Sequence, residues 1–222
     1  MFSVAIDGPA GAGKSSIAKV IAKHLNFIYV DTGALYRAVG LYALKNNISP
    51  SDSSTIINNL NNIKLDLTFK NNEQKVIMNG DDVSLSIRTP EASMASSKVS
   101  AIPEVRKFLF DLQRDIAKNS NIIMDGRDIG TVVLPNASIK IFLTASDKQR
   151  ALRRLKELKQ NGIYSDFESV LKDIRERDYN DSNRDIAPLK IADDAIIVDT
   201  TELDFEQSIN KIETIIKERL YG

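Results

Sequence analysis

The chain carries Gly8-Pro9-Ala10-Gly11-Ala12-Gly13-Lys14-Ser15 close to its amino terminus, and this run matches the pattern G-x-x-x-x-G-K-[ST]. Residues 2–6 precede it as a short apolar run that predicts a buried strand. Residues 16–25 follow it, with apolar side chains at helical spacing. A strand, a glycine-rich loop and a helix are the context in which this pattern binds phosphate groups. The sequence therefore predicts a phosphate-binding loop in an α/β fold.

The chemistry of this loop follows from its residue types. Glycines lack the Cβ that would block close approach, so backbone N–H groups can point at phosphate oxygens beside a helix amino terminus. We expect Lys14 to reach the β- and γ-phosphates, and the Ser15 hydroxyl to bind Mg²⁺ jointly with them. A turn that merely connects strand and helix is the alternative, and it would leave Lys14 without a purpose. The residues expected to bind ATP here are Gly8, Pro9, Ala10, Gly11, Ala12, Gly13, Lys14, Ser15 and Ser16.

Further short apolar runs predict the rest of a parallel sheet. They occupy residues 28–30, 122–124, 139–143 and 195–198. Helical periodicity follows the first run at residues 34–44 and the last at residues 204–220. We therefore predict a five-stranded parallel sheet of the P-loop NTPase type, built from buried strands and covered by helices on both faces.

The pattern changes at Lys64, where Leu65, Leu67 and Phe69 begin to alternate with polar residues. A second extended run begins at Lys75, which predicts an antiparallel hairpin. We interpret residues 63–117 as an inserted α+β segment that contains this hairpin and a helix after Pro103. Residues 1–62 and 118–222 then form the core domain, with a helical lid at about residues 148–165.

Composition excludes several classes of protein. Lys plus Arg and Asp plus Glu number 30 each, so no net field attracts nucleic acid. The chain has no Cys, which excludes a disulfide scaffold, a thiolate zinc site and a cysteine nucleophile, and fits the cytoplasm. No apolar run is long enough to span a bilayer, and the amino terminus does not have the pattern of a signal peptide. His24, the one histidine, is expected at the surface.

Charged residues directly follow the strand predicted at 122–124. Asp125-Gly126-Arg127-Asp128 would lie at the carboxyl end of a parallel strand, where open α/β sheets bind ligands. A charged turn without function is the alternative. Farther along the chain, Arg177, Asp181 and Arg184 stand at i, i+4 and i+7, so on a helix they would share one face. Two guanidiniums around a carboxylate could bind a phosphate, although spacing alone favours a solvated face.

A third group of basic residues, Arg150, Arg153 and Arg154, is spaced at i, i+3 and i+4. It would form a positive edge suited to a triphosphate or to charge that develops during transfer. A solvated helix face explains the same spacing equally well.

Several of these motifs together resemble bacterial cytidylate kinases over nearly the whole length of the chain. The motifs are GPAGAGKSS at 8–16, DTGALYR at 31–37, SSKVSAIPEVR at 96–106, DGRDIGTVV at 125–133, KIFLTAS at 140–146 and ERDYNDSNR at 176–184. The resemblance implies transfer of the γ-phosphate of ATP to CMP, and to dCMP, with Mg²⁺, by a cytoplasmic monomer. It also implies that the inserted segment at 63–117 binds the nucleoside monophosphate. The balanced charge and the lack of a long apolar run predict that neither nucleic acid nor a membrane is a partner.

The resemblance also implies roles for individual residues. Ser97, Arg106 and Asp128 would contact cytosine, Asp181 the ribose, and Arg37, Arg127, Arg177 and Arg184 the acceptor phosphate. Thr32, Tyr36, Asp125 and Gly126 would line the same pocket. Lys14, Arg127, Arg177 and Arg184 would be catalytic, and Arg150, Arg153 and Arg154 would contact ATP. The family often has Ser at the position of Thr32, which keeps the hydroxyl and adds a methyl group.

Physical chemistry agrees with cytosine as the base. Its N4 amino group can donate to a carboxylate such as Asp128, whereas uracil presents the O4 acceptor there. The attacking phosphate oxygen is already anionic, so no general base is needed and catalysis is positioning plus charge neutralisation. Two alternatives stay open: a kinase of another small acceptor, and a regulatory switch protein. A switch GTPase would ordinarily carry an N-K-x-D element, which this sequence lacks.

Overall fold

The computed structural model describes residues 1–70, 73–118, 120–160 and 162–222. The chain divides into two compact units: one comprises Met1 with Ile28–Ile122, and the other comprises Phe2–Phe27 with Ile123–Gly222. Five strands form one sheet in the order β2-β6-β1-β7-β8, and three form a second sheet in the order β3-β4-β5. The predicted α/β fold with a five-stranded parallel sheet is confirmed. None of the helices in the described ranges combines the length and apolar character needed to cross a membrane.

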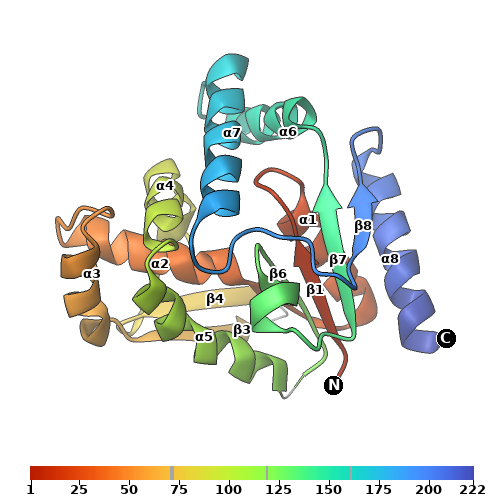
Figure 1. Ribbon diagram of the computed structural model, residues 1–222, viewed down its shortest axis with the longest axis horizontal. Coiled ribbons are helices and arrows are strands. Elements are labelled where there is room, and N and C mark those ends of the chain that lie inside the picture. Colours follow the sequence, from red (N-terminus) through yellow and green to blue (C-terminus); the bar gives the residue numbers. More distant parts are fainter. Residues whose placement is uncertain (71–72, 119, 161) are drawn as a thin grey trace. The chain divides into compact units, whose positions relative to one another are not determined.

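The unit that contains the phosphate loop is built on parallel strands (Figure 1). Val4 lies opposite Ile139 in the β1–β7 pair, and Ile141 lies opposite Ile196 in the β7–β8 pair. The strands are β1 (Ser3–Asp7), β6 (Ile122–Gly126), β7 (Ile139–Thr144) and β8 (Ile196–Asp199). The helices are α1 (Lys14–Leu25), the π-helix η3 (Ile129–Val133), α6 (Asp147–Gln160), α7 (Phe167–Asn183) and α8 (Phe205–Tyr221).

The core of this unit forms where the apolar faces of α1 and α8 meet the sheet. Ile17 and Ile21 of α1 are buried, as are Ile212 and Ile216 of α8, and the two helices contact each other. Each such side chain stabilises the fold by roughly 1.5–3 kcal/mol through removal from water. For α1, the helical spacing in the sequence therefore predicted the burial of Ile17 and Ile21 correctly.

The strand at 195–198 differs from its prediction as a buried strand. Val198 is fully buried, but Ile196 is 43% exposed and Ile197 is 57% exposed. β8 is the last strand in the sheet order, and Ile197 points to the opposite face from Val198. An apolar run does not reveal whether its strand lies at the centre or at the edge of a sheet, so the prediction of burial was wrong here.

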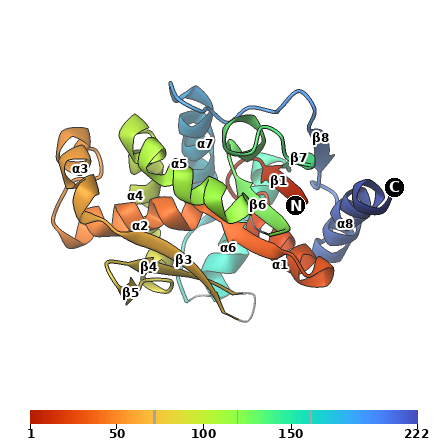
Figure 2. The same cartoon turned by 90° about the horizontal axis from the view of Figure 1, so that it is seen from below.

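The other unit contains the antiparallel sheet, which Figure 2 shows beside α2. Leu65 lies opposite Met78 and Leu67 opposite Val76, which confirms the predicted hairpin. The strands are β2 (Ile28–Asp31), β3 (Leu65–Lys70), β4 (Glu73–Met78) and β5 (Asp81–Asp82). The helices are α2 (Thr32–Lys45), α3 (Ser53–Asn59), η1 (Leu60–Asn62), η2 (Ser86–Arg88), α4 (Pro90–Val99) and α5 (Pro103–Lys118). The segment at 63–117 lies inside this unit, and its status as a separate binding domain stays a prediction.

Helix α4 was not predicted, although its start has a recognisable signal. Thr89 accepts a hydrogen bond from the Ala92 N–H at 3.2 Å, and Pro90 occupies the first turn. The helix packs on α2 at Gly40, where an added Cβ would lie 2.9 Å from the Ala95 Cβ. Glycine at this position therefore allows α4, which carries Ser97, to approach α2 closely.

Candidate active site

The phosphate loop connects β1 to α1 and depends on a glycine at its first position. Gly8 has φ +149°, and an added Cβ would lie 2.0 Å from the carbonyl oxygen of Leu143 in the neighbouring strand β7. Only glycine lets the loop leave the strand at this point without displacing β7. Sequence and structure thus agree on the strand, loop and helix that the motif requires.

Lys14 is buried at the start of α1, and its Nζ donates to the carbonyl oxygen of Pro9 at 2.7 Å. Burial, together with the charge of Arg127, lowers the pKa of Lys14 to about 7, although Asp125, Asp181 and Asp7 oppose this shift. The ammonium group is surrounded by charged side chains and donates to the neutral carbonyl of Pro9. An anionic phosphate in this place would restore its positive charge.

Ser15 is the second residue of α1, and its Oγ donates to Asp125 Oδ2 at 2.8 Å. A hydroxyl and a carboxylate are hard oxygen ligands of the kind that Mg²⁺ prefers. The described part of the chain has no cluster of three or more His or acidic side chains suited to a metal ion. This donor set fits a cation that is held partly by nucleotide phosphates rather than by a cage of protein groups.

The charged turn after β6 and the end of α7 form one largely buried series of opposite charges. Arg127 Nε donates to Asp181 Oδ2 at 2.7 Å. Arg184 lies 3.8 Å from Asp181 Oδ1 and 3.3 Å from Asp128 Oδ1. We call Arg127, Asp181, Arg184 and Asp128, in this order, the charge chain. The structure therefore brings together two segments that the sequence marked separately.

Electrostatics in the charge chain favour the ionised forms. Burial raises the pKa of Asp181, but the charge and hydrogen bond of Arg127, with the charges of Arg184 and Arg177, outweigh it and hold the pKa below its ordinary value. For Arg127 the signs are opposite: burial lowers the pKa, but the charge and hydrogen bond of Asp181 outweigh burial, so the pKa of Arg127 is raised above its ordinary value. Guanidinium groups held in this way are prepared for an anionic ligand.

The position of Arg184 corrects one prediction. Helix α7 ends at Asn183, and Arg184 has extended backbone angles of φ −68° and ψ 144°. The predicted helical face at i, i+4 and i+7 was therefore wrong for its last member. Arg184 still meets Asp181 because the chain turns back: its Nε donates to the carbonyl oxygen of Ala187 at 2.7 Å, and the Leu189 N–H donates to the carbonyl oxygen of Asp181 at 2.7 Å.

The basic residues of α6 have other partners. Arg150 is buried and donates to the carbonyl oxygens of Ala145 at 2.9 Å and Ala10 at 2.8 Å. Arg153 donates to the carbonyl oxygen of Ala12 at 3.3 Å and that of Thr200 at 2.7 Å. Arg154 pairs with Glu157 on its own helix at 2.8 Å. Two of the three thus contact the phosphate loop through its backbone, and direct contact of all three with ATP stays a prediction.

Asp178 belongs to the same arrangement and was not singled out from the sequence. One carboxylate oxygen accepts from the Ala10 N–H at 3.2 Å, and the other pairs with Arg150 at 2.6 Å. Arg150 and Asp178 together bind both backbone groups of Ala10, so α6 and α7 hold the loop between them. The high density of charged residues in the stretch that contains Arg177, Asp178 and Asp181 indicated a candidate site in the sequence. The spacing did not reveal which partner each residue contacts.

The predicted acceptor residues of the other unit lie at the start of α2. Asp31 caps α2 by accepting from the Ala34 N–H at 3.0 Å, and its second oxygen accepts from Arg37 at 2.7 Å. The Nε of Arg37 is buried and has no hydrogen-bond partner among the described residues. Thr32 is buried beside them. Gln74, which was not predicted, holds Asp31 through hydrogen bonds of 2.8 Å and 3.1 Å to its backbone N–H and carbonyl groups.

Tyr36, Ser97 and Arg106 lie in the same unit. The guanidinium carbon of Arg106 lies 5.5 Å from the centre of the Tyr36 ring, and NH1 donates to the carbonyl oxygen of Ser100 at 3.1 Å. The carbonyl of Ser97 accepts from the Ser100 hydroxyl at 3.0 Å. The end of α4 and the start of α5 therefore orient Arg106 above an aromatic ring. The roles of these residues toward a nucleotide stay predictions.

Comparisons with known proteins agree with the motifs. The family model for cytidylate kinase matches residues 4–218. A cytidylate kinase of Ligilactobacillus salivarius (strain UCC118) is 54% identical over 98% of this chain and 97% of its own, and one of Caldicellulosiruptor bescii is 51% identical over 95% and 93%.

A solved structure supports the fold as well. The crystal structure of a shikimate kinase from Bacteroides thetaiotaomicron covers 100% of this chain and 99% of its own, with a TM-score of 0.50 and 14% identity. At this identity the likeness concerns the fold alone. The sequence relatives decide the family, and the chain belongs to the cytidylate kinase family.

Proposed function

We propose that this chain transfers the γ-phosphoryl group of ATP to CMP, and to dCMP, to give ADP and CDP or dCDP. The observation that carries the proposal is the buried charge chain in the same unit as the phosphate loop, close enough for Arg127, Asp125 and Asp181 to shift the pKa of Lys14. A loop for a donor triphosphate and guanidiniums for a second phosphate are what a phosphotransferase between two nucleotides needs. Membership of the cytidylate kinase family supports CMP as the acceptor.

On the donor side, we propose that the backbone of residues 8–16 binds the ATP phosphates and that Lys14 neutralises them. Ser15 and the phosphates would hold Mg²⁺, which supplies further neutralisation of the triphosphate when it is bound. The buried network of Arg150, Asp178 and Ala10 supports this role, since it keeps the loop in one conformation before the nucleotide arrives.

On the acceptor side, we propose that guanidinium groups bind the CMP phosphate and that the remaining polar groups bind the nucleoside. The phosphate residues are Arg37, Arg127, Arg177 and Arg184. The nucleoside residues are Asp181 for the ribose, Ser97, Arg106 and Asp128 for cytosine, and Thr32, Tyr36, Asp125 and Gly126 as further contacts to the nucleotide. The buried, unpartnered Nε of Arg37 supports its role, because a buried guanidinium donor is costly to leave unused.

The chemical step then needs positioning more than proton transfer. The attacking oxygen belongs to a phosphate that is ionised near neutral pH, so it needs no general base. Two anionic phosphates repel each other, and the arginines and Lys14 offset this repulsion as the two come into line. We propose that the segment at 148–165 acts as a lid that keeps water from the γ-phosphate, so that hydrolysis without CMP is slow.

We also propose that the enzyme works in the cytoplasm as a monomer, with nucleotides as its small-molecule partners. A chain with no Cys fits a reducing compartment, since it needs no disulfide. Sedimentation of the purified chain would test the monomer, and a single species at twice the mass of 24.7 kDa would contradict it.

Product analysis tests the function directly. The purified chain is incubated with ATP, Mg²⁺ and CMP, and the nucleotides are separated by anion exchange. We expect ADP and CDP in equal amounts, and little ADP when CMP is omitted. Equal ADP release with and without CMP would indicate a hydrolase or switch protein, and ADP formed only with another acceptor would overturn the assignment of CMP.

A further inference from the structure

The π-helix η3 begins directly after Asp128, the residue that we propose reads cytosine. The carbonyl of Asp128 accepts from the N–H groups of Val132 at 2.9 Å and Val133 at 3.1 Å. The first N–H groups of such a helix have no acceptor inside it, so they need a partner from elsewhere. An aspartate that precedes a helix ordinarily supplies this partner with its own carboxylate.

Asp128 does not act in this ordinary way. Its side chain makes no capping hydrogen bond to η3, and its Oδ1 lies 3.3 Å from Arg184 instead. The carboxylate is therefore part of the charge chain, at its end. Something else must satisfy the start of η3 for Asp128 to keep this position.

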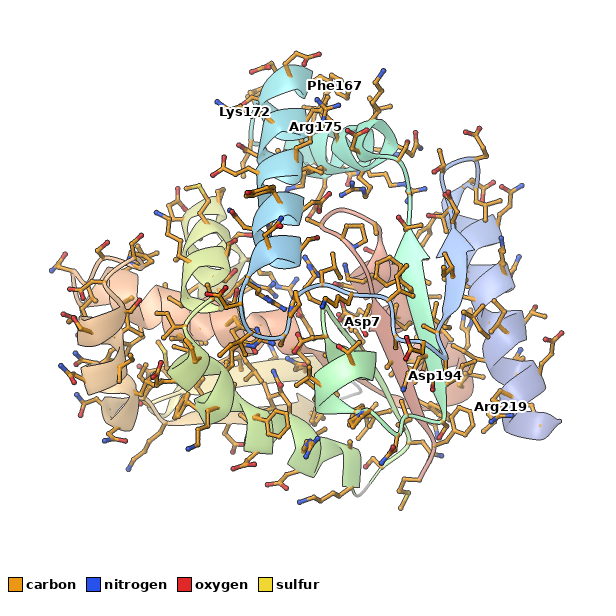
Figure 3. The ribbon with its side chains drawn as sticks, in the orientation of Figure 1. Asp7, Phe167, Lys172, Arg175, Asp194 and Arg219 are labelled. Carbon is orange, nitrogen blue, oxygen red and sulfur yellow. The ribbon has the colours of Figure 1, made fainter. Side chains whose placement is uncertain are left out.

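Asp7 is the partner that satisfies it. Oδ1 of Asp7 accepts from the Ile129 N–H at 2.8 Å, and Oδ2 accepts from the Gly130 N–H at 2.7 Å. Figure 3 labels Asp7 at the end of β1, beside the short helix that follows β6. Gly130 contributes to the fit, because an added Cβ there would lie 3.3 Å from Asp7 Oδ2 and 3.0 Å from the Lys140 Cδ.

This carboxylate is retained at a cost. Asp7 is 5% exposed, and burial is the main reason that its pKa is raised, with a smaller increase from the charge of Asp128. The N–H groups of Gly130 and Ile129 and the charge of Lys14 oppose this increase, and the resulting pKa is about 6. An apolar residue would avoid the cost of burial at the end of a core strand, so the hydrogen bonds to η3 are the feature that explains an aspartate here.

We propose that Asp7 is a positioning residue that caps η3 in place of Asp128 and thereby keeps the Asp128 carboxylate on Arg184, where it reads the acceptor base. This inference rests on the proposed function for the role of Asp128. Because Asp7 also directly precedes Gly8, this one residue fixes the position of the turn that contains Asp128 relative to the start of the phosphate loop.

The inference predicts what happens when Asp7 is removed. The N–H groups of Ile129 and Gly130 lose their acceptors, and the nearest residue with a capping preference is Asp128 itself. Its carboxylate would turn to η3 and leave Arg184. Selection of CMP over UMP then weakens, while the phosphate loop keeps the contacts that Arg150, Arg153 and Asp178 make with it.

Kinetics with three variants test this. Asp7→Ala should lower the ratio of kcat/KM for CMP to that for UMP by about tenfold or more, with KM for ATP changed by less than about threefold. Asp7→Asn keeps one acceptor, so its ratio of kcat/KM for CMP to that for UMP should lie between the ratios of the wild type and Asp7→Ala. Asp204→Ala is the matched control, because Asp204 caps α8 by accepting from the Gln207 N–H at 2.8 Å, and it should keep the ratio while lowering the Tm. An unchanged ratio in both Asp7 variants, or equal increases in KM for ATP and CMP, would overturn the proposal.

A measurement without substrate separates this proposal from the proposed function. Amide hydrogen exchange of Ile129 and Gly130 is followed in the wild type, in Asp7→Asn and in the double variant Asp7→Asn, Asp128→Ala, which removes the replacement acceptor. We expect faster exchange in Asp7→Asn and a further increase in the double variant, because Asp128 takes over part of the capping. No change in either variant overturns the capping role, whatever the enzyme phosphorylates. Faster exchange in the single variant with no further increase in the double variant would contradict the replacement by Asp128.

Discussion

Arginines on α6 and arginines in the charge chain look alike in the sequence but have different partners in the structure. Arg150 and Arg153 donate to backbone carbonyls of the phosphate loop, and the carboxylate that pairs with Arg150, that of Asp178, itself accepts from the Ala10 N–H of the loop. Arg127 and Arg184 pair with the carboxylates of Asp181 and Asp128. A carboxylate partner can share its arginine with a ligand phosphate of similar charge and geometry, whereas a carbonyl of the loop cannot be replaced without loosening the loop. The comparison teaches that the first set holds the site and the second set is suited to bind within it.

The largest effect is expected for Arg184→Ala. Removing this guanidinium leaves Asp128 and Asp181 with one buried partner fewer and removes a proposed contact to the CMP phosphate. We expect kcat/KM for CMP to fall by at least about 100-fold, as for the loss of one partner from a buried charge pair. The assay is coupled ADP release at varied CMP.

A matched variant sharpens this prediction. Arg175 lies on α7 with 59% of its side chain exposed and pairs with Asp147 at 2.7 Å, so Arg175→Ala should change kcat/KM by less than about twofold. Similar losses in both variants would show that the charge chain has no special role and that α7 responds as a whole.

Arg150→Ala tests the other side of the comparison. It removes the hydrogen bonds to the carbonyl oxygens of Ala145 and Ala10 and leaves the Asp178 carboxylate without its guanidinium partner, so we expect a fall in Tm of about 5 °C or more and a higher KM for ATP. Differential scanning calorimetry measures the first effect and steady-state kinetics the second. Lys156→Ala, at an exposed position on the same helix, serves as the control. A normal Tm with lost ATP binding would mean that Arg150 contacts ATP rather than the fold.

Much of this arrangement could be predicted from the sequence, and the missing parts have physical reasons. The phosphate loop was predictable because backbone geometry ties its chemistry to glycine, Lys14 and Ser15 at fixed spacing. The partners of Arg184 were not, since the chain leaves the helix and turns back through Ala187, which has φ +49°. A spacing rule applies only while the helix continues.

Asp7 shows a second kind of limit. In the sequence it is an acid at the end of an apolar run, and nothing local distinguishes a solvated carboxylate from one that caps a helix 122 residues away. Gln74 was missed for the same reason, because its partners belong to Asp31 in another strand. Contacts between residues distant in sequence depend on the sheet order, which the apolar runs do not reveal.

Asp128→Asn tests base reading within the charge chain. An amide can donate to the O4 of uracil, whereas the carboxylate only accepts, so the substitution should favour UMP relative to CMP. We expect the ratio of kcat/KM for CMP to that for UMP to fall by about tenfold or more, because one polar contact to a base contributes about 1–3 kcal/mol of discrimination. A ratio that stays constant while both rates fall would indicate that Asp128 only stabilises Arg184.

The smallest effect concerns the dependence of stability on pH. The pKa of Asp7 is raised to about 6 in the folded chain from an ordinary value of 3.8, so the folded state binds the proton more tightly than the unfolded state and stability falls as the pH rises through this range. Relative to Asp7→Asn, the wild type should lose about 1 kcal/mol of unfolding free energy between about pH 5 and pH 7.5. Urea unfolding of both proteins at both pH values measures the difference. An increase in the unfolding free energy of the wild type, relative to Asp7→Asn, from about pH 5 to about pH 7.5 would contradict this expectation.

The ratio of kcat/KM for CMP to that for UMP and AMP in the unmodified enzyme, with ATP and Mg²⁺ at saturation, tests the central claim most directly. The charge chain with Asp128 at its end predicts a preference for CMP of at least about 100-fold over both, since polar sites that pair with one base leave a buried group unpaired with another. Equal values for CMP and UMP would contradict base reading by this carboxylate, even if the enzyme transfers phosphate rapidly to both.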